Sequence, residues 1–82
     1  MDEKERAKKD IDKLDHAISE FKKLKLDAKY PQILEYAENY FSDSKHFFDS
    51  KDYFTSFGAA NYAYGFIDAI LILEGKKDEK TF

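Results

Sequence analysis

The stretch Tyr53–Leu73, which reads YFTSFGAANYAYGFIDAILIL, decides the fold of this 82-residue chain. Asp68 is its single charged residue, and apolar side chains occur on almost every side of a helix drawn through it. One apolar stripe consists of Tyr53, Phe57, Ala60, Tyr64, Ile67 and Leu71, and a second, almost opposite, consists of Ala59, Tyr62, Phe66, Ala69 and Leu73. Such a helix lies at the centre of its fold, spans a membrane or presents one face to a partner.

We expect this stretch to be a central helix and not a membrane span. Asn61 and Asp68 would lie within the hydrocarbon, where an aspartate costs roughly 3 kcal/mol at the centre. The tyrosines are also spread along the segment instead of being gathered at its two ends. Because residues 1–9 are densely charged where a signal peptide would be apolar, we expect a cytoplasmic protein without a membrane partner.

Two more helices are predicted upstream of this stretch. Apolar residues recur at alternating steps of four and three at Ala7, Ile11, Leu14, Ile18 and Phe21, which predicts a helix at about residues 3–25. Pro31 suits the first turn of a second helix, at about residues 31–48, because its missing N–H has no intrahelical partner there. Capping residues at 49–52 and a glycine at position 75 place the last helix at about residues 52–74.

These elements predict an all-α fold, specifically an antiparallel up-down-up three-helix bundle. Short connections place neighbouring helices antiparallel, and 82 residues suffice for one core but not for two. We therefore expect a single domain over residues 1–82, with a frayed tail at 76–82. The absence of cysteine excludes a disulfide scaffold and a thiolate metal site.

A family resemblance is carried by the segment YFTSFGAANYAYGFIDA at residues 53–69, together with YA at 36–37 and YFSDS at 40–44. These residues resemble the archaeal family known as domain of unknown function 357, over roughly residues 35–75. The chain departs from the family at Lys51, where the family tends to have glycine before the aspartate. The resemblance implies a compact three-helix bundle of archaeal origin with no agreed activity.

The polar residues of the last helix are the best candidates for a binding pocket. Asn61, Tyr64, Gly65 and Asp68 are spaced at i, i+3, i+4 and i+7, so all four share one face of the helix. One interpretation is a small-ligand or catalytic pocket. The other is that Asp68 accepts hydrogen bonds from a neighbouring helix and fixes the helix register.

Gly58 and Gly65 each lower helix stability by about 1 kcal/mol relative to alanine, so a compensating role is expected. We expect close approach of a neighbouring helix or ring, over a small-residue surface shared with Ala59, Ala60, Ala63 and Ala69. A ligand groove is the alternative.

Histidines and acidic residues suggest two metal sets, Asp12 with His16 and Glu20, and Asp43 with His46. Both sets face away from the predicted core, and neither histidine has a glutamate three residues before it, as di-iron bundles require. We therefore expect no metal and no cofactor. Both histidines are expected to be solvated, so the sequence argues against an enzyme without excluding one.

Lys22, Lys25 and Lys29 form a basic edge near the end of the first helix, which allows weak RNA association that salt would abolish. Residues 30–75, which hold most of the aromatic side chains, carry two basic and seven acidic groups. Single-strand binders combine exposed aromatic rings with basic residues, so nucleic acid is not the favoured partner.

A protein-interaction domain, with homodimerisation as one form of it, is the leading hypothesis. In a three-helix bundle each helix meets two neighbours, so two opposite stripes exceed what those neighbours cover. The candidate interface is the second stripe, Ala59, Tyr62, Phe66, Ala69 and Leu73. An exposed apolar surface of this kind marks an interaction site.

Overall fold

The computed structural model describes residues 2–76, and none of them lies in a β-strand. The helices are α1 (Glu3–Lys23), α2 (Leu26–Lys29), α3 (Pro31–Asp49) and α4 (Tyr53–Leu73). The predicted all-α class is confirmed for this part of the chain. Residues 77–82, which make up most of the tail predicted to fray, lie outside the described residues.

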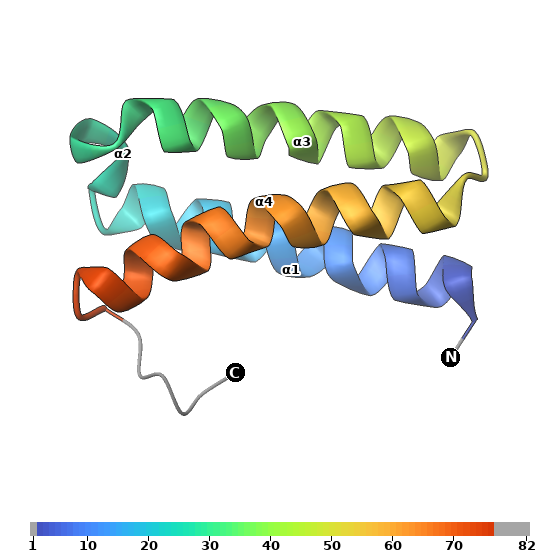
Figure 1. Ribbon diagram of the computed structural model, residues 1–82, viewed down its shortest axis with the longest axis horizontal. Coiled ribbons are helices and arrows are strands. Elements are labelled where there is room, and N and C mark those ends of the chain that lie inside the picture. The colour runs from blue at the N-terminus through green and yellow to red at the C-terminus, as the bar shows by residue number, and fades with distance from the viewer. Residues whose placement is uncertain (1, 77–82) are drawn as a thin grey trace.

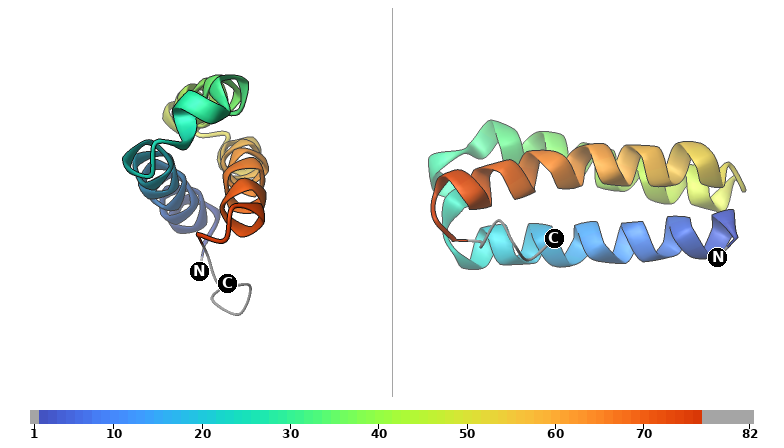
Figure 2. Two further views of the ribbon diagram at one scale, coloured as in Figure 1. Left: turned by 90° about the vertical axis from the view of Figure 1, so that its left-hand side faces the viewer. Right: turned by 60° about the horizontal axis from the view of Figure 1, so that its bottom comes forward.

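The three long helices lie side by side, and the one-turn helix α2 connects α1 to α3 (Figure 1). The chain reverses direction between α1 and α3 and again between α3 and α4 (Figure 1). Seen from one end, the long helices occupy the corners of a triangle (Figure 2). Helix α4 packs extensively on both α1 and α3, which contact each other less.

The connection after α1 differs from the prediction. The first helix ends at Lys23, two residues before its predicted end, because Lys25 adopts a left-handed conformation with a φ of 62° that an α-helix cannot contain. Leu26, only 5% exposed, then opens the unpredicted helix α2 and packs into the core. Residues 2–76 therefore contain four helices instead of the predicted three.

The other helix ends follow local capping rules. The carboxylate of Asp2 accepts a hydrogen bond of 2.8 Å from the Glu5 N–H, and that of Asp52 accepts one of 3.2 Å from the Thr55 N–H. Pro31 is the first residue of α3, as its position predicts. These caps place the start of each long helix within one residue of the sequence expectation.

The core consists of small and aliphatic side chains together with one fully buried aromatic ring. Its members are Leu14, Ala17, Ile18, Phe21, Leu26, Ala37, Ala60, Ala63, Ile67 and Leu71. Helix α3 contributes only Ala37 to this cluster, and its rings Tyr40 and Phe41 are partly buried at the margin. The aromatic residues of α3 and α4 thus surround the core more than they fill it.

Candidate functional site

The side of α4 that faces away from the core is the most unusual surface of the domain. Its exposed residues, here called the outer face of α4, are Phe54, Thr55, Gly58, Tyr62, Gly65, Ala69 and Leu73. All seven are uncharged. By contrast, every exposed residue of α1 is charged or polar, as is usual for the solvated side of a bundle helix.

Three large side chains dominate the outer face of α4. Phe54 is 68% exposed, Tyr62 is 56% exposed and Leu73 is 78% exposed. Helix α4 is long and apolar enough to cross a membrane by length and composition, and only 28% of its most apolar window is buried. The apolar character of α4 therefore exceeds what packing against α1 and α3 uses.

The two glycines of this face do not have the packing role that the sequence suggested. A Cβ atom added to Gly58 or to Gly65 would meet nothing within 4 Å. The neighbouring helices approach α4 at Ala60 and Ala63, which are 0% exposed, and not at the glycines. The expectation of close packing at Gly58 and Gly65 is therefore wrong within this chain.

An aromatic cluster continues the outer face of α4 onto α3. The ring of Tyr62 lies 5.1 Å from that of Tyr40 and 4.7 Å from that of Phe66, centroid to centroid. The exposed ring of Tyr36 lies 6.3 Å from Phe66. The predicted interface stripe is thus divided: Tyr62, Ala69 and Leu73 are exposed, whereas Ala59 and Phe66 are partly buried.

Asn61, the first polar candidate, joins α4 to α1. Its side-chain N–H donates a hydrogen bond of 2.7 Å to Asp10 Oδ2 and another of 2.9 Å to the carbonyl of Phe57. The guanidinium of Arg6 lies 4.0 Å from the same Asp10 oxygen and 4.6 Å from the centre of the Phe57 ring. Asn61 therefore links α4 to α1 through Asp10.

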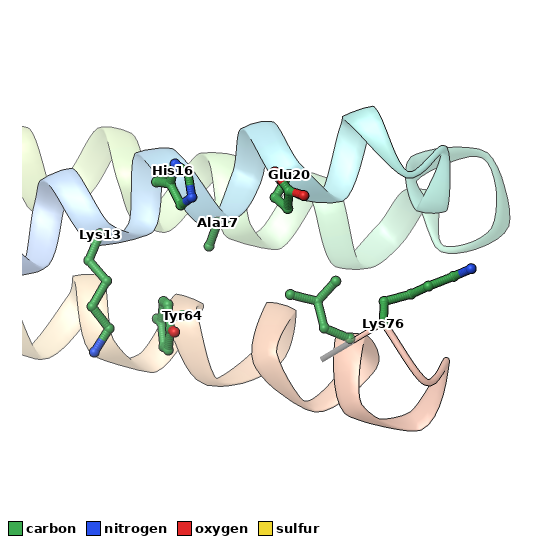
Figure 3. A pocket seen from close by; sticks show the side chains of 7 residues that line it. Lys13, His16, Ala17, Glu20, Tyr64 and Lys76 are labelled. Carbon is green, nitrogen blue, oxygen red and sulfur yellow. The ribbon is translucent and has the colours of Figure 1, made fainter. Parts of the chain in front are cut away.

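Tyr64, the second polar candidate, lines a hollow of about 370 Å³ between α1 and α4 (Figure 3). The Lys13 side chain extends from α1 to α4, and its Nζ lies 4.2 Å from the centre of the Tyr64 ring (Figure 3). The other lining residues are His16, Ala17, Glu20, Leu71 and Lys76. Asp68, the third candidate, is partly buried.

A family model described as "Protein of unknown function (DUF357)" matches residues 6–75. The chain belongs to the DUF357 family. No curated protein and no solved structure gives a significant match. The match extends the likeness seen in residues 35–75 to most of α1, so the DUF357 domain includes all three long helices.

The basic edge of this DUF357 chain is largely neutralised by ion pairs. Lys22 Nζ lies 3.2 Å from Glu38 Oε2, and Lys29 donates hydrogen bonds of 3.1 and 3.0 Å to the two carboxylate oxygens of Glu74. Hydrogen bonding to Glu74 raises the pKa of Lys29. The same bonds, together with one donated by the Tyr30 hydroxyl, lower the pKa of Glu74. Two of the three lysines proposed to contact RNA thus have acidic partners.

The set of Asp12, His16 and Glu20, considered from the sequence as metal ligands, does not form a three-residue metal site in this DUF357 chain. Within residues 2–76, no group of three or more His, Asp or Glu side chains could hold a metal ion. Asp12 lies 3.6 Å from Lys8, whereas His16 and Glu20 line the hollow.

Sequence reasoning missed four members of the outer face in this DUF357 chain, namely Phe54, Thr55, Gly58 and Gly65. The missing signal was the i, i+4 spacing that places Phe54, Gly58 and Tyr62 in one row, and Gly65, Ala69 and Leu73 in another. Treating the glycines as core contacts concealed both rows.

Proposed function

We propose that this domain is an antiparallel up-down-up three-helix bundle that works as a protein-interaction module, with the outer face of α4 as its binding surface. One observation carries this proposal: the seven exposed residues of α4 are all uncharged. A contiguous exposed apolar patch rimmed by polar residues is typical of an interaction site. The charged exposed surface of α1 supplies such a rim.

The chemistry of the outer face also favours a protein partner. Tyrosine and phenylalanine are enriched at interface centres, where charged residues are depleted. Tyr62 packs edge-on against Tyr40 with an interplanar angle of 88°, so its ring is held in place before any partner arrives. A ring that is already ordered loses less conformational entropy when it binds.

The test uses Tyr62→Glu, which introduces a charge at the centre of the outer face. Tyr62 is preferable to Phe66, because Phe66 is partly buried against α3 and its replacement would also disturb the fold. Ser19→Glu, at an exposed position of α1, is the matched control. Circular dichroism should show the same helicity in both variants.

Association is measured by size-exclusion chromatography with light scattering over a wide concentration range, followed by quantitative pull-down from the native host. We expect association of the wild type, with itself or with one stoichiometric protein. Tyr62→Glu should abolish this association, and Ser19→Glu should retain it. Association that survives Tyr62→Glu, or the absence of any association, would contradict the proposal.

The hollow between α1 and α4 supports a second candidate function, the binding of a small anionic ligand. Lys13, His16 and Lys76 supply cationic or hydrogen-bonding groups, alongside one acidic lining residue, Glu20, and Ala17 and Leu71 supply apolar surface. Clefts of a few hundred Å³ with an apolar floor and a few polar groups are typical ligand sites.

Titration of ¹⁵N-labelled protein with inorganic phosphate tests this second function. Saturable chemical-shift changes confined to the hollow, and lost in Lys13→Gln, would support it. Changes that are absent up to millimolar phosphate, or that spread over all surface lysines, would exclude a specific anion site.

A further inference from the structure

We infer that the partner of the outer face is a second copy of this chain. In this arrangement two α4 helices pair antiparallel about a two-fold axis, with Tyr62 of each copy opposite Gly65 of the other. The inference rests on the proposed function and specifies both the occupant and the register of the contact.

Six of the seven residues of the outer face, all but Thr55, have the same spacing in both directions along α4. From Phe54 through Gly58, Tyr62, Gly65 and Ala69 to Leu73, the steps along α4 are four, four, three, four and four. A two-fold contact must be self-complementary, because residue i meets residue j while j meets i. In an antiparallel pair of α4 helices, each of these six residues faces another member of the same set on the second copy.

The register that this spacing sets pairs residues of complementary size. Tyr62, the largest residue near the centre, lies opposite Gly65, around which this chain leaves open space. Gly58 lies opposite Ala69, and two small residues facing each other let helix backbones approach closely. Phe54 lies opposite Leu73, so the two most exposed apolar side chains of α4 cover each other at the ends.

The dimer gives the two glycines a packing role that they do not have in the monomer. Glycine is a poorer helix former than alanine, and nothing within 4 Å requires it at position 58 or 65. A parallel dimer would instead set Tyr62 against Tyr62 and each glycine against itself. That arrangement mismatches the sizes, so the antiparallel register is favoured.

The charge and area of the outer face are also consistent with a second copy. Each chain carries a net charge of −3, but the outer face has no charged residue, so the contact brings no like charges together. Phe54 and Tyr62 expose roughly 250 Å² per copy if each ring offers about 200 Å². With Leu73, Ala69 and the glycine backbone, two copies bury on the order of 1,000 Å², the lower limit for a specific interface.

Single cysteines provide a direct test of the register, because the natural chain contains no cysteine. A disulfide requires Cα atoms within about 7 Å of each other. We expect Gly58→Cys mixed with Ala69→Cys to form a covalent dimer under mild oxidation. Neither variant should crosslink alone, and Ser19→Cys on α1 should not crosslink with any of them.

Gly65→Ala is a second test, chosen because this substitution is not expected to unfold the monomer. The added methyl group improves helix propensity and meets nothing in the monomer, so the melting temperature of the dilute protein should rise. The same methyl group lies under Tyr62 of the second copy, so the dimer dissociation constant should increase at least tenfold. A destabilised protein could not produce both changes.

The outcomes separate this inference from the function on which it rests. A dimer in which Gly58→Cys crosslinks only with itself, or one that Gly65→Ala does not weaken, overturns the register and leaves an interaction function in place. A wild type that is monomeric at every concentration overturns self-association, and pull-down from the host then decides the proposed function. Sedimentation of the monomer with anionic phospholipid vesicles, abolished by Tyr62→Glu, would assign the face to a membrane and overturn both.

Discussion

The hydroxyl of Ser56 on α4 donates a hydrogen bond of 2.6 Å to the backbone carbonyl of Ser44 on α3, and both residues are 0% exposed. The hydroxyl of Ser44 in turn donates one of 2.8 Å to the carbonyl of Phe41. Two buried polar groups are thus satisfied within the α3–α4 contact, and their small size lets the two helices lie close together.

Ser56→Ala should lower the free energy of unfolding. Loss of a buried hydrogen bond costs about 1 kcal/mol, and the better helix propensity of alanine returns less than about 0.5 kcal/mol. Ser42→Ala, at an exposed position of α3, gains propensity without losing this bond and serves as the control. Urea unfolding of both variants measures the difference, and equal stabilities would show that the Ser56–Ser44 bond contributes nothing.

Asn61 and Asp10 should be energetically coupled. Their hydrogen bond of 2.7 Å joins α4 to α1, and the Asp10 side chain is only 12% exposed. Hydrogen bonds to charged groups contribute about 1.5 to 3 kcal/mol, so a double-mutant cycle of Asp10→Ala and Asn61→Ala should give a coupling energy of at least about 1 kcal/mol.

Asp12→Ala in the same cycle provides the reference. Asp12 is exposed and pairs with Lys8 on its own helix, so its effect should add to that of Asn61→Ala. If the Asp10 and Asn61 variants were additive as well, Asn61 would not act through Asp10, and a role in ligand binding would regain support.

The helices were predictable because their signals are local. The apolar spacing, the capping aspartates at positions 2 and 52, and Pro31 each act within a few residues, so the predicted ends of the long helices lie within two residues of those observed. The bond between Asp10 and Asn61 joins residues 51 positions apart, and no periodicity indicates it.

The errors in the sequence-based predictions, namely the missed helix α2 and the role assigned to the two glycines, also have physical causes. Lys25 turns left-handed without the glycine that would signal such a turn, so α2 was missed. Gly58 and Gly65 look alike whether a helix of the same chain or a separate molecule approaches them. Sequence alone cannot tell these cases apart, because the direction that each glycine faces depends on where α1 and α3 pack.

Lys51→Gly should stabilise the domain. Lys51 has a φ of 66° at the end of α3, where its N–H and that of Asp52 donate to the carbonyls of Phe48 and Phe47 in a Schellman motif. A left-handed lysine costs roughly 1 to 2 kcal/mol, and glycine relieves this strain at some cost in unfolded-state entropy. We expect a net gain of about 0.5 to 1 kcal/mol.

Thermal unfolding of Lys51→Gly and Lys45→Gly measures this gain. Lys45 lies inside α3, where glycine should destabilise the helix by about 1 kcal/mol, so the two variants should shift the melting temperature in opposite directions. A lower melting temperature for Lys51→Gly would show that the lysine side chain outweighs the backbone strain.

Glu74→Gln should reveal how the contact between Glu74 and Lys29 depends on pH. Bonds from Lys29 and Tyr30 hold the pKa of Glu74 below 4.5 in the folded protein, so the ionised carboxylate adds stability above that pH. This contribution is lost as the pH falls through the lowered pKa, because the folded state must then take up the proton. The raised pKa of Lys29 has the opposite pH dependence. The stability that the charged lysine contributes is lost at alkaline pH, above 10.5.

Melting curves from pH 7 to pH 2.5 test whether the stability that Glu74 contributes decreases toward acid pH. The wild type should melt at a higher temperature than Glu74→Gln at pH 7, and the difference should shrink below about pH 4.5 and in high salt. Glu35→Gln, at an exposed position of α3, should change the melting temperature less at every pH. A difference between wild type and Glu74→Gln that widens toward acid would mean that burial, and not the bonds from Lys29 and Tyr30, controls this carboxylate.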